Sequence, residues 1–94
     1  MREKDIEAHL RGRVKAIGGK AYKFVSPGNA GVPDRLVCLP GGRIVFVELK
    51  APGKKPTALQ TAEQSKLSRI GCHVYNLDSK EAVDNFIALQ MATQ

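Results

Sequence analysis

Residues 31–50, GVPDRLVCLPGGRIVFVELK, decide the fold because they contain two strand-like segments separated by a short turn. Residues 34–39 and 43–50 are rich in β-branched and apolar side chains, and Pro40-Gly41-Gly42 between them is typical of a turn. The two segments should pair as an antiparallel hairpin. Because residues 44–47 are uniformly apolar, the second strand is expected to be central and covered on both faces.

Three charged residues of this hairpin are expected to meet at one edge of the sheet. Side chains alternate across a strand, so Glu48 and Lys50 share one face. If the hairpin is centred on Gly41, the numbers of opposed residues sum to twice 41, which makes Asp34 the direct partner of Glu48. A two-residue turn would instead place Asp34 opposite Leu49, on the wrong face. The arrangement therefore requires an odd-length loop.

Two carboxylates and an ammonium in this arrangement have the chemistry of a hydrolytic metal site. Opposed Cβ atoms lie about 4.5–5.5 Å apart, which allows Asp34 and Glu48 to share one hard cation such as Mg²⁺. Like charges directly opposed destabilise a sheet, so a metal ion or the Lys50 ammonium is needed to compensate. The alternative is that Asp34 only follows a proline turn, and that Glu48 and Lys50 are solvated residues at the end of a strand.

The remaining segments predict three helices and two further strands. Residues 3–17 have apolar side chains at helical spacing and stop at Gly18-Gly19, and residues 21–25 form the first strand. A second helix is expected from about residue 57 to 70, with Thr57 and Gln60 as a capping box. Its amphipathic pattern consists of Leu59, Ala62, Glu63, Lys66, Leu67 and Ile70.

Residues 72–77 read as the last strand, and Asp78 and Glu81 are expected to cap a final helix. This helix should bury Val83, Phe86 and Ile87, with Leu89 as a further candidate. The order α-β-β-β-α-β-α predicts an α/β fold, a mixed central sheet flanked by helices. Ninety-four residues are enough for one domain, residues 1–94.

Composition narrows the class of partner. The net charge of +6, from 15 Lys and Arg against 9 Asp and Glu, favours a polyanion such as nucleic acid. No apolar run approaches the ~20 residues that span a bilayer, and the charged N-terminus is unlike a signal peptide, so a cytoplasmic protein without a membrane partner is expected. Cys38 and Cys72 are interpreted as buried, reduced thiols. His9 and His73 are interpreted as surface or interface residues.

The order of these motifs resembles the PD-(D/E)XK nuclease superfamily: an acidic first helix, then GVPD, then VELKAP, then a helix bearing Gln60. More narrowly, it resembles the virus-type replication-repair nuclease (VRR-NUC) domain over about residues 3–86. The resemblance is to the stand-alone form of this domain that phages often carry. The PDx…ExK pattern alone is weak, but GVPD…ELK with the helix order and total length is specific. The resemblance implies a restriction-endonuclease-like core and a Mg²⁺- or Mn²⁺-dependent endonuclease.

The resemblance also implies roles for individual residues. Asp34 and Glu48, with the Leu49 carbonyl, would bind the metal, and Lys50 would hold or deprotonate the attacking water. Family members carry an acidic residue on the first helix, for which Glu7 is the better match and Glu3 the runner-up; either could instead be a glutamate stabilised by the helix dipole. Gln60 would orient Lys50 or the water, a role that competes with capping.

Contacts to DNA are expected from the segments that flank the site. Lys54 and Lys55 lie in the turn after Lys50, while Lys23 and Ser26 lie beside the glycine-rich loop 26–33, where Lys23 could equally be a solvated edge residue. Stand-alone family members resemble homodimeric Holliday-junction resolvases, which favours a four-way or otherwise branched DNA substrate. The alternatives are a flap or nicking nuclease, or a non-catalytic DNA-binding module. A phage-encoded protein would act in the host cytoplasm.

Overall fold

The computed structural model describes residues 1–93 and has the predicted order of helices and strands. Its elements are α1 (Glu3–Ala16), β1 (Lys20–Lys23), β2 (Arg35–Leu39), the short 3₁₀ turn η1 (Pro40–Gly42), β3 (Arg43–Leu49), α2 (Ala58–Arg69), β4 (Val74–Leu77) and α3 (Lys80–Ala92). The sheet has the strand order β1-β2-β3-β4, in which β4 is parallel to β3 and the other neighbours are antiparallel. The predicted mixed sheet is thus confirmed.

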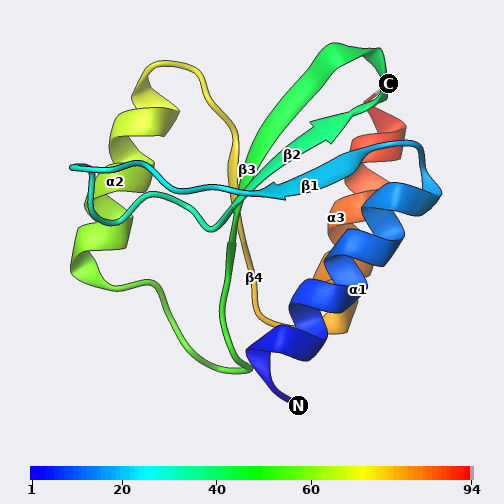
Figure 1. Ribbon diagram of the computed structural model, residues 1–94, viewed down its shortest axis with the longest axis horizontal. Coiled ribbons are helices and arrows are strands. Elements are labelled where there is room, and N and C mark those ends of the chain that lie inside the picture. Colours follow the sequence, from blue (N-terminus) through cyan, green and yellow to red (C-terminus); the bar gives the residue numbers. More distant parts are fainter. Residues whose placement is uncertain (94) are drawn as a thin grey trace.

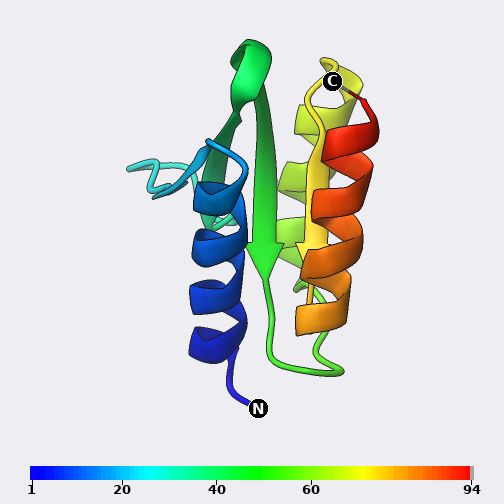
Figure 2. The ribbon, with the colours of Figure 1, turned by 90° about the vertical axis from the view of Figure 1, so that its right-hand side faces the viewer.

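Helices cover the two faces of the sheet unequally. Helices α1 and α3 lie side by side on one face and α2 lies on the other (Figures 1 and 2). The core is formed on the first face, because the apolar stripes of α1 and α3 meet every second residue of β2 and β3. Its fully buried side chains include Ile6, Leu10, Val14, Val37, Val45, Val47, Val83 and Ile87. No helix in residues 1–93 is long and apolar enough to cross a membrane.

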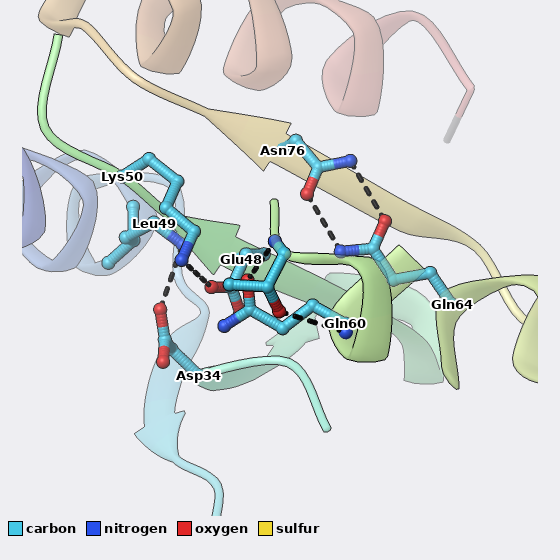
Figure 3. A network of polar contacts seen from close by, with 8 residues as sticks. Asp34, Glu48, Leu49, Lys50, Gln60, Gln64 and Asn76 are labelled. Atoms are coloured by element: carbon cyan, nitrogen blue, oxygen red, sulfur yellow. Dashed lines mark hydrogen bonds and ion pairs between the residues drawn. The ribbon is translucent and has the colours of Figure 1, made fainter. Parts of the chain in front are cut away.

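The opposite face is only partly covered. None of the α2 residues is buried, and Leu59 and Ile70 remain 56% and 78% exposed. The expectation of an amphipathic second helix was therefore wrong. Strand β3 is central, as expected, but its second face is covered only in part, because Glu48 is buried there while Ile44 is 55% exposed. Polar contacts hold α2 instead: Gln64 and Asn76 of β4 exchange two amide hydrogen bonds of 2.8 and 2.9 Å (Figure 3).

Side-chain caps define the starts of α2 and α3. The predicted capping box of α2 is present, since the Gln60 backbone N–H donates to Thr57 Oγ1 at 3.2 Å and the Thr57 N–H donates to Gln60 Oε1 at 2.9 Å. The cap of α3 was predicted one residue too early. Ser79 Oγ accepts from the Ala82 N–H at 2.9 Å, whereas Asp78 accepts from the Gly53 N–H at 3.3 Å. Either residue type can cap a helix, so composition alone did not separate them.

The end of α3 and the burial of the two cysteines also differ from expectation, whereas His9 lies at an interface as expected. Leu89 is 47% exposed and Gln90, one position on, is fully buried, with its Oε1 accepting from Arg43 Nε at 2.9 Å. His9 is an inter-helix residue, because its Nε2 lies 2.7 Å from Asp84 Oδ1 on α3. That hydrogen bond and the nearby Arg13 lower the pKa of the Asp84 carboxyl. Both cysteines are free, as predicted, but only half-buried.

The loop before β2 packs against the first turn of α2 at Gly31. Gly31 has φ +87°, and a Cβ there would lie 2.8 Å from the Leu59 carbonyl oxygen. Gly28 in the same loop has φ +81° but nothing within 4 Å of such a Cβ. We therefore expect Gly28→Ala to lower the free energy of unfolding by about 1–2 kcal/mol from backbone strain. Gly31→Ala should lower it by about 1–3 kcal/mol more, from overpacking.

Urea unfolding followed by circular dichroism measures both values. Gly28→Ala is the matched control, because it makes the same substitution at nearly the same φ without the contact to α2. Equal losses in the two variants would show that the loop does not pack on α2 in solution.

Candidate active site at the end of the β2–β3 hairpin

The hairpin has the register that the charged residues require. Strands β2 and β3 are joined by the three-residue turn η1, with Arg35 opposite Val47 and Leu39 opposite Arg43. Asp34 lies just before β2, and the same register continued by one residue sets it opposite Glu48, consistent with its 3.0 Å hydrogen bond from the Leu49 N–H. The predicted odd-length loop is therefore confirmed, and Glu48 lies on the face of β3 opposite to buried Val47.

A buried ion pair occupies the end of this hairpin. Glu48 is only 1% exposed, and its Oε2 lies 3.2 Å from Lys50 Nζ, whose side chain is 18% exposed. Asp34 Oδ2 accepts a hydrogen bond of 3.0 Å from the Leu49 backbone N–H. Figure 3 shows these residues converging from the ends of β2 and β3. Glu48 and Lys50 are thus not solvated edge residues, because both side chains are largely withdrawn from solvent. Burying a carboxylate costs free energy unless an opposite charge or hydrogen bonds compensate for the lost water.

The negative charge of Glu48 is only partly compensated by its neighbours. Burial, and secondly the negative charge of Asp34, raise the pKa of the Glu48 carboxyl, and Lys50 offsets this only in part. Glu48 Oε1 is buried without a hydrogen-bond partner anywhere in residues 1–93. An unpartnered buried carboxylate oxygen beside a second carboxylate is the donor set that a divalent cation satisfies.

The number of acidic donors decides which cation fits. Across residues 1–93, no three His, Cys, Asp or Glu side chains come together in a group that could hold a metal ion. Asp34 and Glu48 are therefore joined by no third acidic side chain. Mg²⁺ is usually held by one or two carboxylates, with water and substrate phosphate completing its coordination, so a two-carboxylate site fits such an ion.

Helix α1 approaches Asp34 from the other face of the sheet, in a cleft that Glu48 and Lys50 do not line. This cleft of about 200 Å³ is lined by Glu3, Glu7, Lys23, Phe24, Asp34, Arg35 and Leu49. The structure thus brings both candidate acids of α1 into one cleft with Asp34. Glu7 does not point freely into it, because its Oε1 lies 2.9 Å from Arg35 Nη2 and 3.3 Å from Arg11 Nε.

Arg35 is the residue that the sequence reasoning missed. Its side chain is 12% exposed and fixes Glu7 within the cleft. The sequence held part of the signal, because strand alternation points Arg35 to the face of β2 opposite to Asp34. Only the fold shows that α1 packs on that face and brings Glu7 to Arg35.

The other predicted residues take different positions. Gln60 Oε1 is used by the helix cap, so capping is the role that the structure displays. Ser26 accepts from Asn29 Nδ2 at 2.9 Å within its own turn. Lys54 and Lys55 line a separate hollow together with Lys50, Asn76 and Asp78. Three lysines thus surround one opening next to Glu48.

Known proteins resemble this chain in both sequence and structure. No family model matches the sequence. The chain is 58% identical over 81 residues to a protein named "Putative nuclease p44" from Acyrthosiphon pisum secondary endosymbiont phage 1, covering 86% of this chain and 87% of that protein. A solved structure named "VRR_NUC domain" superposes with a TM-score of 0.86 and 34% identity, covering 92% of this chain and 94% of that one. The chain therefore belongs to the VRR-NUC nuclease family.

Proposed function

We propose that residues 1–94 form one nuclease domain that hydrolyses DNA phosphodiesters as a Mg²⁺- or Mn²⁺-dependent endonuclease. The observation that carries this proposal is the buried Glu48 carboxylate, which faces Asp34 and keeps one oxygen unpartnered although Lys50 is paired to the other. A buried carboxylate beside a second negative charge destabilises the fold, so the arrangement is best explained by a bound cation during function.

Each residue of the site has a distinct role in this proposal. Asp34 and Glu48, with the Leu49 carbonyl, would hold the ion. When bound there, it would supply Lewis-acid polarisation of the scissile phosphate and a lowered pKa of water. Lys50, held by Glu48, orients or deprotonates the attacking water and stabilises negative charge developing on the phosphate. Glu7, held by Arg35, completes the water network, with Glu3 as the alternative acid from α1.

The residues around the site bind and orient the substrate. The Gln60 side-chain oxygen caps α2, so its amide nitrogen is the group available to orient water near Lys50. Lys54 and Lys55 contact backbone phosphates next to the cut, and Lys23 and Ser26 do so on the side of the loop 26–33. A net charge of +6 supports such contacts, because each neutralised phosphate releases counterions.

The preferred substrate is a branched DNA, with a Holliday junction cut by a homodimer. A four-way junction presents two symmetry-related strands, and a two-fold dimer presents two equivalent sites. A 94-residue chain with five Phe and Tyr residues has little surface for base readout, which favours recognition by shape and charge. A flap or nicking nuclease is the second candidate. The expected location is the cytoplasm, that of the host for a phage protein.

Cleavage assays on defined DNA test the proposal. We expect the purified protein to cut DNA with Mg²⁺ or Mn²⁺ and not with EDTA, and to cut a four-way junction at two symmetric positions. Light scattering should then show a dimer. Cuts confined to flaps or nicked duplex would favour the second candidate. Shifted DNA mobility without cuts, in either metal, would identify a non-catalytic DNA-binding module and contradict the proposal.

A further inference from the structure

One face of α1 changes sign of charge along its length. Glu3, Glu7, Arg11 and Lys15 follow each other at intervals of four residues, so each lies beside the next in one row that winds slowly around the helix. Each interval corresponds to a rise of about 6 Å. The two acids lie at the end of the helix that lines the candidate active site, and the two basic residues continue away from it.

A second cleft lies beside the basic half of this face. It has a volume of about 390 Å³ and is lined by Arg11, Lys15, Gly19, Lys20 and Ala21. It is formed by α1 together with β1, the strand that follows α1 after a short turn (Figure 1). The active-site cleft also has residues from α1 and β1, but Asp34, Arg35 and Leu49 of the hairpin line it as well. The two clefts share no lining residue, but both lie along α1 and β1, with Glu7 and Lys23 at the first and Arg11 and Lys20 at the second.

The cations of this second cleft are available to a ligand. Its lining contains no acidic residue, and Lys15 and Lys20 form no ion pair with any residue from 1 to 93, although Lys20 Nζ lies 4.8 Å above the Tyr22 ring. Arg11 contacts Glu7 at 3.3 Å, but Glu7 also has the shorter contact of 2.9 Å with Arg35. Glu7 therefore keeps a counter-charge when the guanidinium of Arg11, whose side chain is 56% exposed, turns to a ligand.

Arg13, another basic residue of the same helix, differs because its charge is already neutralised by an ion pair. Arg13 forms an ion pair of 2.5 Å with Asp84 of α3 and so belongs to the packing of the two helices. Arg11 and Lys15 have no such structural partner on another helix. Their positive charge, adjacent to a site for phosphodiester hydrolysis, matches a polyanion that extends beyond the reacting phosphate.

We propose that the cleft of Arg11 and Lys15 binds the sugar-phosphate backbone of the DNA strand adjacent to the phosphate that is cut. This inference rests on the proposed function and assigns the strand a path along the α1–β1 cleft. Lys15, two intervals and so about 12 Å from Glu7 along the helix, contacts a phosphate beyond the scissile one. Such a contact contributes affinity without sequence preference.

The salt dependence of DNA binding tests this path. Binding of a labelled four-way junction and a duplex is measured by anisotropy in EDTA, so that no cleavage intervenes, at several KCl concentrations. We expect Lys15→Glu to weaken binding to both DNAs and to reduce the slope of log K against log salt by about 0.9, the value for one lost phosphate contact. Lys15→Gln, which removes the charge without reversing it, should reduce the slope similarly.

Lys66→Glu on α2 is the matched control. It makes the same substitution in the last turn of a helix and lowers the net charge from +6 to +4, as Lys15→Glu does. We expect it to leave the slope unchanged. Equal slopes for Lys15→Glu, Lys15→Gln and Lys66→Glu, in a protein that cuts DNA, would overturn the path alone. A wild-type protein that neither binds nor cuts DNA would instead remove the proposed function, and the path with it.

Discussion

Asp34→Asn is expected to abolish DNA cleavage while the protein stays folded and binds DNA. The substitution removes one of the two carboxylates that face each other at the end of the hairpin. If these carboxylates hold the ion, its loss removes several kcal/mol of transition-state stabilisation, and about 4 kcal/mol corresponds to about 10³-fold in rate. Single-turnover cleavage at saturating protein, with Mg²⁺ or Mn²⁺, measures the loss separately from DNA affinity.

The fold should tolerate this change well. Asn keeps a carbonyl oxygen that can accept the Leu49 N–H bond, which Asp34 Oδ2 accepts at 3.0 Å. It also removes the negative charge that helps to raise the pKa of Glu48. The melting temperature without metal should therefore be unchanged or higher. Added Mg²⁺ or Mn²⁺ should raise the melting temperature of the wild type and not that of Asp34→Asn, since only a ligand bound to the native state stabilises it.

Asp78→Asn is the matched control for this experiment. Asp78 lines the hollow next to Lys50 and also accepts a backbone N–H, that of Gly53 at 3.3 Å, but it does not face Glu48. We expect Asp78→Asn to retain cleavage and the thermal response to metal. Cleavage at the wild-type rate by Asp34→Asn would remove Asp34 from the reaction.

The hairpin could be predicted because its determinants are local. Strand alternation and the length of the turn fix which side chains face each other, and both can be counted in the sequence. The pairing of Asp34 with Glu48 needed no information from the rest of the chain. The same holds for the Thr57 and Gln60 cap, which lies within four residues.

The packing of α2 and the environment of Glu7 could not be predicted in this way. Leu59 and Ile70 fit a helical pattern, but which side of a helix meets the sheet depends on the loops that connect it, and here both point to solvent. The ion pair of Glu7 with Arg35 joins residues 28 positions apart and depends on how α1 crosses β2. Such contacts are set by tertiary packing, which local patterns leave open.

Glu48→Gln is expected to abolish cleavage and at the same time to stabilise the metal-free protein. Glu48 is 1% exposed and has one oxygen without a partner, so its ionised form is disfavoured in the fold. Gln keeps the shape and an oxygen that Lys50 can donate to, and it removes the repulsion with Asp34. We expect the free energy of unfolding in EDTA at neutral pH to rise by about 1–3 kcal/mol.

The pH dependence should identify the cause. The pKa of Glu48 is raised above its ordinary value of 4.5, so the native state binds this proton more tightly than the unfolded state does. The stability that this protonation contributes is complete below pH 4.5 and is lost as pH rises through the raised pKa. The variant, which lacks the group, should therefore gain most over the wild type above that pKa and least in acid. Urea unfolding in EDTA across this range measures the difference.

Lys50→Ala should destabilise the protein, whereas Glu48→Gln should stabilise it. The comparison distinguishes the cost of burying the Glu48 charge from the loss of the ion pair. It leaves the Glu48 carboxylate buried with no ammonium at 3.2 Å, and an unpaired buried charge of this kind destabilises by about 3–5 kcal/mol. Adding Glu48→Gln to Lys50→Ala should recover most of that loss, because the charge needing a partner is gone. If Glu48→Gln alone proved as destabilising as Lys50→Ala, the pair would be a stabilising ion pair of the fold. The raised pKa and the unpartnered oxygen would then give no support to a cation site.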